Sequence, residues 1–168
     1  AWELCEPTPL APNEVAQTAS VDHLAINECL SNPPTGADDW IELHNTTKER
    51  VDLSGWRLAK AIKFTFPTQF TIDPDGYAIL CKNKSAFAKF YSVAPGGEFE
   101  TPLKQNKQTI ELIDRDGKTV DRVEFDDNAP WPQGPDGRSA SLERICPTGP
   151  GTIPENWIGS PLSGARLT

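Results

Sequence analysis

Short runs of β-branched and aromatic residues, repeated along most of the chain, are the feature that most constrains its fold. Runs of this length and composition are typical of strands, and the 16 prolines and 12 glycines fall mainly in the turn-like segments between them. The pattern therefore argues against a helical protein and predicts about eight strands. The predicted strands lie within residues 23–28, 40–44, 56–58, 64–66, 77–81, 109–113, 120–125 and 139–145.

Aspartate followed by glycine marks three of the predicted turns. These are the segments 74–76, 115–117 and 135–137, each of which ends in Gly. Because Gly adopts a positive φ at little steric cost, we expect it to take that conformation in each turn. The Asp116-Gly117 pair, which lies between two apolar runs, predicts a β-hairpin.

Alternation within the runs indicates sheets that bury one face. Ile41 and Leu43 fall on one side of their predicted strand, and so do Val123 and Phe125. One-sided burial is typical of antiparallel sheets, so a sandwich or a barrel is expected. Only Ser85–Tyr91 has a helical spacing, with Ser85 as the expected N-cap of one short crossover helix.

Charge and hydropathy limit the classes of partner. The formal net charge is −8 and the sequence pI is about 4.7, so nucleic acid and anionic membrane surfaces are disfavoured partners. No apolar stretch approaches the ~18 residues of a membrane-spanning helix, so no membrane insertion is expected.

The organisation of the chain is predicted to be one domain with an extended N-terminal segment. Residues 1–20 carry three prolines among polar and small residues and are expected to form a leader or linker, with the folded domain spanning 21–168. The chain starts with Ala1 and has no Met, which favours a processed form or part of a larger chain.

Cys5, Cys29, Cys81 and Cys146 are spread along the chain without a C-x-x-C pair. This spacing does not favour zinc, which usually takes clustered ligands. Two disulfides in an exported protein are the main expectation, and four cysteines allow three connectivities. The alternative is four buried thiols in a reducing compartment.

The sequence gives little support to catalysis. There is no Gly-x-Ser-x-Gly elbow, no phosphate-binding glycine loop, and only His23 and His44 as candidate bases, both inside predicted strands. We therefore predict no catalytic residues, no bound cofactor and no enzymatic activity.

Two groups of residues are candidate ligand-binding sites. Glu28, Asp38, Asp39 and Glu42 lie on or beside the first two predicted strands, where hard oxygen ligands for calcium would converge if those strands pair. Solvated loops and ion pairs with Lys or Arg are the alternative interpretation. Trp131, which lies between two prolines, either closes one end of the sandwich or is exposed as a platform for a ligand.

Several short motifs, taken in order, carry a family resemblance. They are Leu24-Ala-Ile-Asn-Glu28, Asp39-Trp-Ile-Glu-Leu-His-Asn45, Val51-Asp-Leu-Ser-Gly-Trp-Arg-Leu58, Phe66-Pro67 and Pro74-Asp-Gly-Tyr-Ala-Ile-Leu80, followed by segments 117–123, 131–132, 136–143 and 156–157. Together they resemble the lamin tail domain family from about residue 22 to residue 160. The resemblance implies an immunoglobulin-like antiparallel β-sandwich, found at the end of nuclear lamins and as a non-catalytic module of exported bacterial proteins.

The resemblance and the composition together give a functional expectation. The chain has no heptad run, and its acidic balance and four cysteines favour the exported bacterial branch over a filament protein. We expect a protein-interaction or attachment module located outside the cell, in the periplasm or on the cell surface, that binds a protein or a cell-envelope component. The alternatives are a calcium-dependent or carbohydrate-binding adhesion domain and an intracellular scaffold that self-associates.

Overall fold

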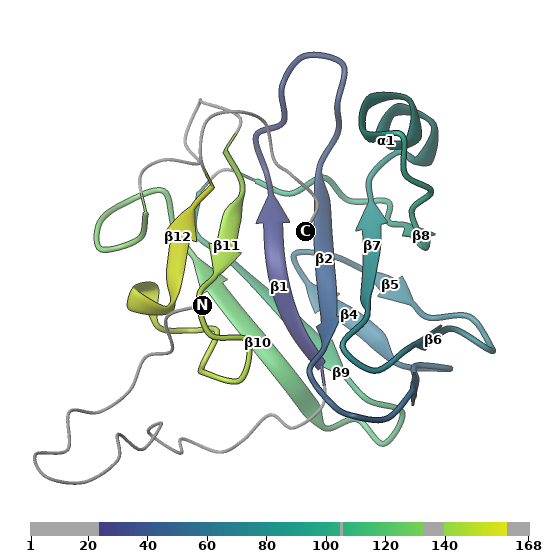
Figure 1. The fold of residues 1–168 in the computed structure, drawn as a ribbon. Helices are drawn as coiled ribbons and strands as arrows, with labels where there is room; N and C mark the ends of the chain where they lie inside the picture. The colour runs from purple at the N-terminus through teal and green to yellow at the C-terminus, as the bar shows by residue number, and fades with distance from the viewer. Residues whose placement is uncertain (1–23, 105, 133–139, 161–168) are drawn as a thin grey trace, which may run out of the picture.

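The computed structural model describes residues 24–104, 106–132 and 140–160, and these form an immunoglobulin-like sandwich of antiparallel sheets (Figure 1). The predicted leader, residues 1–20, and His23 lie outside the described residues. The strands are β1 (Leu24–Leu30), β2 (Trp40–Asn45), β3 (Val51–Asp52), β4 (Arg57–Lys60), β5 (Phe64–Thr65), β6 (Thr71–Ile72), β7 (Tyr77–Cys81), β8 (Gly97–Glu98), β9 (Gln108–Ile113), β10 (Thr119–Phe125), β11 (Leu142–Arg144) and β12 (Trp157–Gly159).

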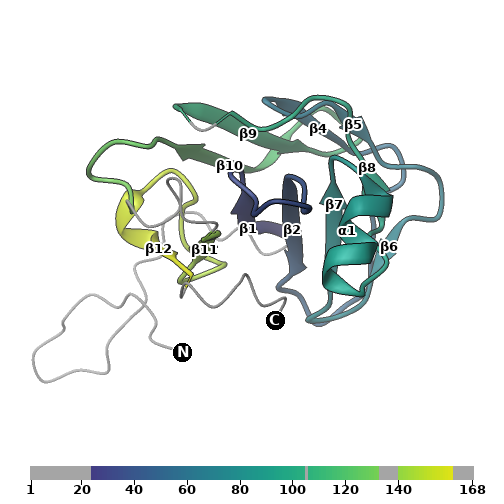
Figure 2. The same cartoon turned by 90° about the horizontal axis from the view of Figure 1, so that it is seen from above.

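The larger sheet has six strands in the order β12-β11-β1-β2-β7-β8. All neighbours are antiparallel except β7 and β8, which are parallel and are joined by the helix α1 (Lys84–Tyr91). The smaller sheet, β10-β9-β4-β5, packs on one face of the larger sheet, and the two layers are seen edge-on in Figure 2. A ribbon of β3 and β6 completes the described strands.

The main hydrophobic core lies between the two sheets. Ile41 and Leu43 of β2 face it, as do Val123 and Phe125 of β10, which confirms the alternation predicted from the sequence. Leu53 is fully buried in the same core, where Gly55, with φ +77°, turns the chain back. Burial of this apolar area is the main source of stability of a sandwich of this size.

The helix α1 covers part of the outer face of the larger sheet (Figure 2). Phe87 and Tyr91 pack against Trp40 of β2, and with Ile79 they form a second, smaller core. The predicted crossover helix is therefore confirmed, but its N-cap lies two residues earlier than expected. Asn83, not Ser85, is the N-cap, because its side chain accepts a hydrogen bond from the Ala86 N–H at 2.9 Å.

A buried ion pair connects the two sheets. The Arg144 guanidinium of β11 donates to both carboxylate oxygens of Asp121 on β10, at 2.6 and 3.1 Å, and its Nη1 also donates to the Ile26 carbonyl of β1. Asp121 in turn accepts the Ile26 N–H at 2.8 Å. Three strands from two sheets are thus held by one bidentate pair, whose side chains are almost inaccessible to solvent.

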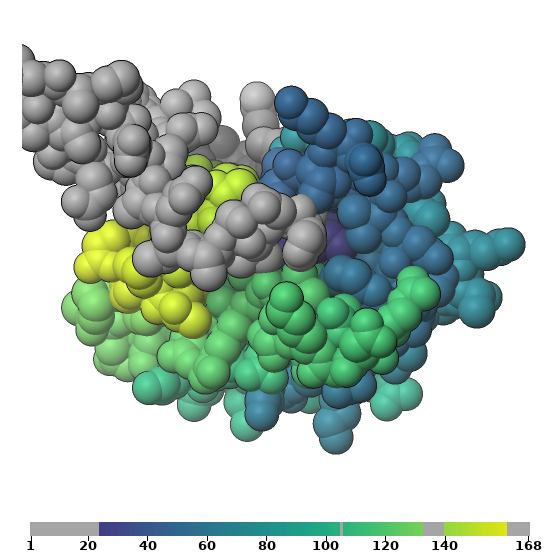
Figure 3. Space-filling model, turned by 90° about the horizontal axis from the view of Figure 1, so that it is seen from below, coloured from purple at the N-terminus to yellow at the C-terminus, as the bar shows by residue number. Residues whose placement is uncertain are grey.

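Three turns were predicted from Asp-Gly pairs, and the described ones follow the predictions in part; Figure 3 views the end of the molecule that carries the β9–β10 hairpin, drawn in green. Gly117 has φ +86° in the β9–β10 hairpin, as expected, and the neighbouring Arg115 lies 3.8 Å from Asp52. In the 74–76 turn, however, Asp75 takes the positive φ, +54°, and not Gly76. Gly76 is required there for a different reason, since a Cβ would lie 2.8 Å from the Asp73 carbonyl oxygen. The 135–137 turn lies outside the described residues.

The eight predicted strands correspond to β1, β2, β4, β5, β7, β9, β10 and β11, with ends that differ by a few residues. The prediction missed β3, β6, β8 and β12, which have only two or three residues each and so show no periodicity. No helix in the described ranges has the length and apolar character needed to cross a membrane.

Candidate functional site: the groove beside β7

One edge of β7 is only half covered by another strand. β8 pairs with Leu80 and Cys81, at the C-terminal end of β7, and leaves Tyr77–Ile79 without a neighbouring strand on that side. In the chain preceding β8, the Gly96 N–H donates a backbone hydrogen bond to the Ile79 carbonyl at 2.8 Å. An unpaired stretch of this kind is available for pairing with another chain.

The register shows which backbone groups face this open edge. Asn45 N–H donates to the Gly76 carbonyl, so residues 76, 78 and 80 bond to β2 and the alternate residues direct their N–H and C=O groups away from it. The Ile79 and Cys81 carbonyls accept bonds from Gly96 and Phe99, as this alternation requires. Among the described residues, the N–H and C=O of Tyr77 and the N–H of Ile79 remain without a backbone partner.

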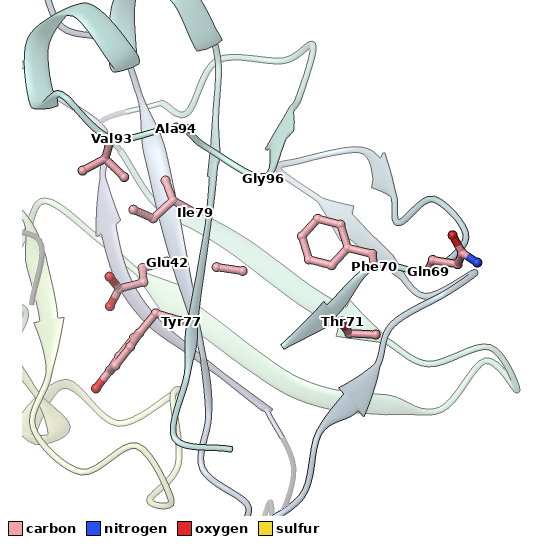
Figure 4. Close-up of a pocket in the computed structure, with 10 residues that line it drawn as sticks. Glu42, Gln69, Phe70, Thr71, Tyr77, Ile79, Val93, Ala94 and Gly96 are labelled. Carbon is pink, nitrogen blue, oxygen red and sulfur yellow. The ribbon is translucent and has the colours of Figure 1, made fainter. Parts of the chain in front are cut away.

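A hollow of about 610 Å³ lies along this edge and is called the β7 groove (Figure 4). It is lined by Glu42, Gln69, Phe70, Thr71, Tyr77, Ala78, Ile79, Val93, Ala94 and Gly96. The lining is mainly apolar, and Tyr77 and Val93 expose 44% and 41% of their surface although both are large hydrophobic residues. Open, apolar and next to unpaired backbone, the groove has the features of a peptide-binding site.

Tyr77 is held in place by His44. The two rings stack with centroids 4.3 Å apart and planes inclined by 9°, and His44 Nε2 lies 2.8 Å from the Asp75 carboxylate. This arrangement fixes the position of the exposed tyrosine at one end of the groove. Within the described residues, the buried His44 Nδ1 has no hydrogen-bond partner.

Three glutamates lie side by side on the outer face of the larger sheet. Glu28 of β1 is directly opposite Glu42 of β2 on one side and Glu143 of β11 on the other. Glu28 and Glu42 are 1% and 0% exposed, and the Oε1 of Glu28 and the Oε2 of Glu42 have no hydrogen-bond partner in the part of the chain that the structure describes. The other oxygen of Glu42 accepts a 3.0 Å bond from the Asn27 side chain.

This arrangement raises the pKa of all three glutamates. Burial raises the pKa of Glu28 from 4.5 to about 8, opposed by the nearby Ser141 hydroxyl and reinforced by the charges of Glu42 and Glu143. Burial also raises the pKa of Glu42 to about 6, against the hydrogen bond from Asn27, and it raises the pKa of Glu143. Because its pKa is about 8, Glu28 is therefore protonated near neutral pH.

The four predicted calcium ligands divide into two groups. Glu28 and Glu42 lie together, but Asp39 accepts the Leu103 N–H at 2.7 Å and Asp38 accepts the Asp39 N–H at 3.0 Å, so both aspartates are engaged with backbone. Burial raises the pKa of Asp39 to about 6, with the Leu103 bond opposing the rise. Across the described ranges, no three His, Cys, Asp or Glu side chains are arranged to hold a metal ion. Sequence inspection missed Glu143, because only the β1–β11 register places it beside Glu28.

The predicted pair of disulfides is not present among the described cysteines. Cys29, Cys81 and Cys146 are buried free thiols, and Cys5 lies outside the described residues. Cys29 faces the main core, whereas Cys81 belongs to the small core under α1, and β2 separates their strands. Two strand spacings amount to roughly 10 Å, beyond the span of about 7 Å that a disulfide can bridge. The Cys146 thiol lies 3.4 Å from the Thr148 hydroxyl.

Trp131 lies at the end of the sandwich near β12. It is partly buried, packs on the main core, and its ring centroid lies 6.4 Å from that of Trp157. The nearby Arg144 guanidinium stacks on the Trp157 ring at 5.7 Å. The position of Trp131 is that of a residue closing one end of the core, with part of its surface left accessible.

Comparison with known families gives one match. The profile of the Lamin Tail Domain family matches residues 17–127, a span that covers β1 to β10 and includes the β7 groove. No curated protein matches the chain. Lamin tail domains are non-catalytic, immunoglobulin-like modules, and the family suggests a protein-interaction or scaffold role. Because the match spans more than half of the sequence and its fold agrees with the observed sandwich, the chain belongs to the lamin tail domain family.

Proposed function

We propose that the chain is a protein-interaction module of an exported or surface protein and that it binds an extended peptide segment of a partner in the β7 groove. The observation that carries the proposal is the uncovered edge at Tyr77–Ile79 beside a mainly apolar hollow of about 610 Å³. Binding requires no catalytic group, in keeping with the family to which the chain belongs.

Strand addition explains how such a segment binds. Its backbone pairs with the free N–H and C=O of Tyr77 and the N–H of Ile79, and alternate side chains enter the hollow between Phe70 and Val93. Hydrogen bonds to the backbone give affinity for an extended chain of any sequence, whereas the apolar lining selects the side chains. The preferred segment thus alternates apolar residues with others that face solvent.

The charge of the molecule favours a different protein over a second copy as the partner. The chain has a net charge of −8, and Glu42 forms part of the groove wall. A second copy would bring the same acidic surface to this wall, and like charges brought together cost free energy. A neutral or basic partner has no such cost.

A displayed library of random ten-residue peptides tests the proposal, with the full chain as bait. We expect enrichment of peptides that alternate apolar residues. Thr71→Trp, which places a ring in the groove from an exposed position, should abolish the enrichment, whereas Thr68→Trp on the same exposed segment but outside the lining should leave it unchanged. Equal enrichment on both variants would locate peptide binding elsewhere and reject the groove.

Light scattering at several concentrations tests the alternative of self-association. A monomer at all concentrations is expected. A dimer that Thr71→Trp abolishes would show that a second copy occupies the groove, in the manner of a self-associating scaffold, and would overturn the choice of partner.

The location outside the cytoplasm is supported by the acidic composition, not by the cysteines, since the three described thiols are unpaired. Fractionation of the native source with an antibody against the chain tests it. Recovery with extracellular, periplasmic or surface material is expected, and recovery only with cytoplasmic proteins would reject this part of the proposal.

A further inference from the structure

We infer that the partner segment in the β7 groove carries an arginine or lysine whose charged head group binds between Glu28 and Glu42. This inference rests on the proposed function and specifies the chemistry of the partner. It predicts that one position of the bound peptide is basic and that the two glutamates are the cause of that preference.

The buried carboxylates have acceptor atoms that nothing in the described chain satisfies. Glu28 Oε1 and Glu42 Oε2 lack hydrogen bonds, although the two residues are 99% and 100% buried. Buried acceptors in native structures are nearly always satisfied, so two on neighbouring strands indicate a donor that binds there.

The missing donor is cationic. Among the described residues, no Lys or Arg forms an ion pair with Glu28, Glu42 or Glu143. The buried guanidinium of Arg144, next to Glu143 on β11, is engaged by Asp121 of the other sheet. Carboxylates are rarely buried unless they are paired. Because no three ligands in the described ranges converge as a metal ion requires, an organic cation fits the site better.

The groove gives such a cation a route to the carboxylates. Glu42 is part of the groove lining, and its side chain lies on the same face of the sheet as those of Tyr77 and Ile79 (Figure 4). The alkyl part of a Lys or Arg side chain can lie against these two residues while the head group reaches the Glu42 Oε2. Arginine is the better match, since its planar group has five N–H donors for acceptors on two neighbouring strands.

Binding of the cation also changes the protonation state of Glu28. Among the described residues, Glu28 faces Glu42 and Glu143 on the adjacent strands and Tyr91 on α1, with His44 and Tyr77 further along β2 and β7. None of these described groups carries a permanent positive charge. A guanidinium beside Glu28 favours its ionised form and expels the proton it holds near neutral pH. The affinity of a basic peptide should therefore rise about tenfold per pH unit between pH 6 and 8.

The test uses the same peptide library with three further baits. Glu28→Gln and Glu42→Gln each replace a carboxyl group that can ionise beside the cation, with little change of shape, and Glu100→Gln removes an exposed carboxylate as the matched control. On the unaltered chain and on Glu100→Gln, we expect one basic position within the alternating apolar pattern. On the two site variants, the alternation should persist and the basic position should be lost.

Titration of one enriched peptide provides the quantitative measurement. Replacing its arginine with citrulline, which is neutral and nearly isosteric, should weaken binding at least tenfold at pH 8 on the unaltered chain and less than twofold on Glu42→Gln. Alternating peptides without a basic position, or a basic preference that survives both variants, would overturn this inference and leave the proposed function intact. Enrichment of no alternating peptide would overturn the proposed function itself.

Discussion

Replacing Glu28 by Gln should make the protein more stable in alkaline solution and leave it nearly unchanged in acid. Glu28 is 1% exposed and faces two other glutamates without a cation in the described chain. Its pKa is about 8 in the folded protein against an ordinary value of 4.5. Between these two values the folded state holds a proton that the unfolded state has released, so this stabilising contribution is complete below pH 4.5 and is lost as the pH rises to 8.

The magnitude follows from the shift. A change of one pKa unit corresponds to about 1.4 kcal/mol, so the shift of Glu28 from 4.5 to about 8 amounts to roughly 5 kcal/mol across this window. Glutamine has no proton to lose and keeps this stability at pH 8.5. We therefore expect the variant to exceed the unaltered chain by about 5 kcal/mol at pH 8.5 and to differ from it by less than about 1 kcal/mol at pH 4.5.

Urea unfolding at pH 4.5, 6.5 and 8.5, monitored by tryptophan fluorescence, measures this difference. Glu100→Gln, at an exposed position, is the matched control and should follow the unaltered chain at each pH. The reasoning would be refuted if the free energy of unfolding of the Glu28→Gln variant and of the unaltered chain changed in parallel with pH. The same experiment shows that loss of peptide binding by this variant does not result from unfolding.

Three further predictions concern the ion pair, the thiols and metal binding. Arg144→Met should lower the free energy of unfolding by about 3 to 5 kcal/mol, because it leaves the buried Asp121 charge without its cation; a loss below about 1 kcal/mol in urea unfolding would contradict this. Cys29, Cys81 and Cys146 are buried, and burial raises the pKa of the Cys29 and Cys81 thiols. We therefore expect these three to resist a maleimide in the native protein at pH 7.5 and to react after denaturation, as mass spectrometry would show, and fast native labelling of any of them would be inconsistent with this fold. Calcium at 5 mM should leave the melting temperature unchanged within ~1 °C, since no three ligands converge in the described ranges; a clear rise would restore the adhesion-domain alternative.

The fold could be predicted from the sequence where the local pattern was strong. Alternation in β2 and β10 placed Ile41, Leu43, Val123 and Phe125 on the core side, because a period of two is set by strand geometry alone. The N-cap of α1 was placed two residues late, since Asn83 and Ser85 are both good N-caps and only the hydrogen bond from the Ala86 N–H distinguishes them.

The candidate site could be predicted only in part, because it depends on pairing between distant segments. The sequence pointed to Glu28 and Glu42, but it grouped them with Asp38 and Asp39, whose carboxylates bond to nearby backbone instead. Glu143 lies beside Glu28 only because of the register between β1 and β11. The groove exists because β8 pairs with only the last two residues of β7. Neither feature leaves a periodic signal, since each is set by where a neighbouring strand ends.

The ion pair between Arg144 and Asp121 joins the segment matched by the family profile to a strand that lies outside it. The matched segment ends at residue 127, yet the guanidinium that neutralises Asp121 belongs to β11, beyond that limit. A polypeptide cut at residue 127 would retain an inner carboxylate with only the Ile26 N–H beside it, and would also leave the edge of β1 uncovered. The cooperative unit of folding is thus longer than the stretch by which the family is recognised, and a recombinant fragment intended to behave as an independent domain must extend at least through β12.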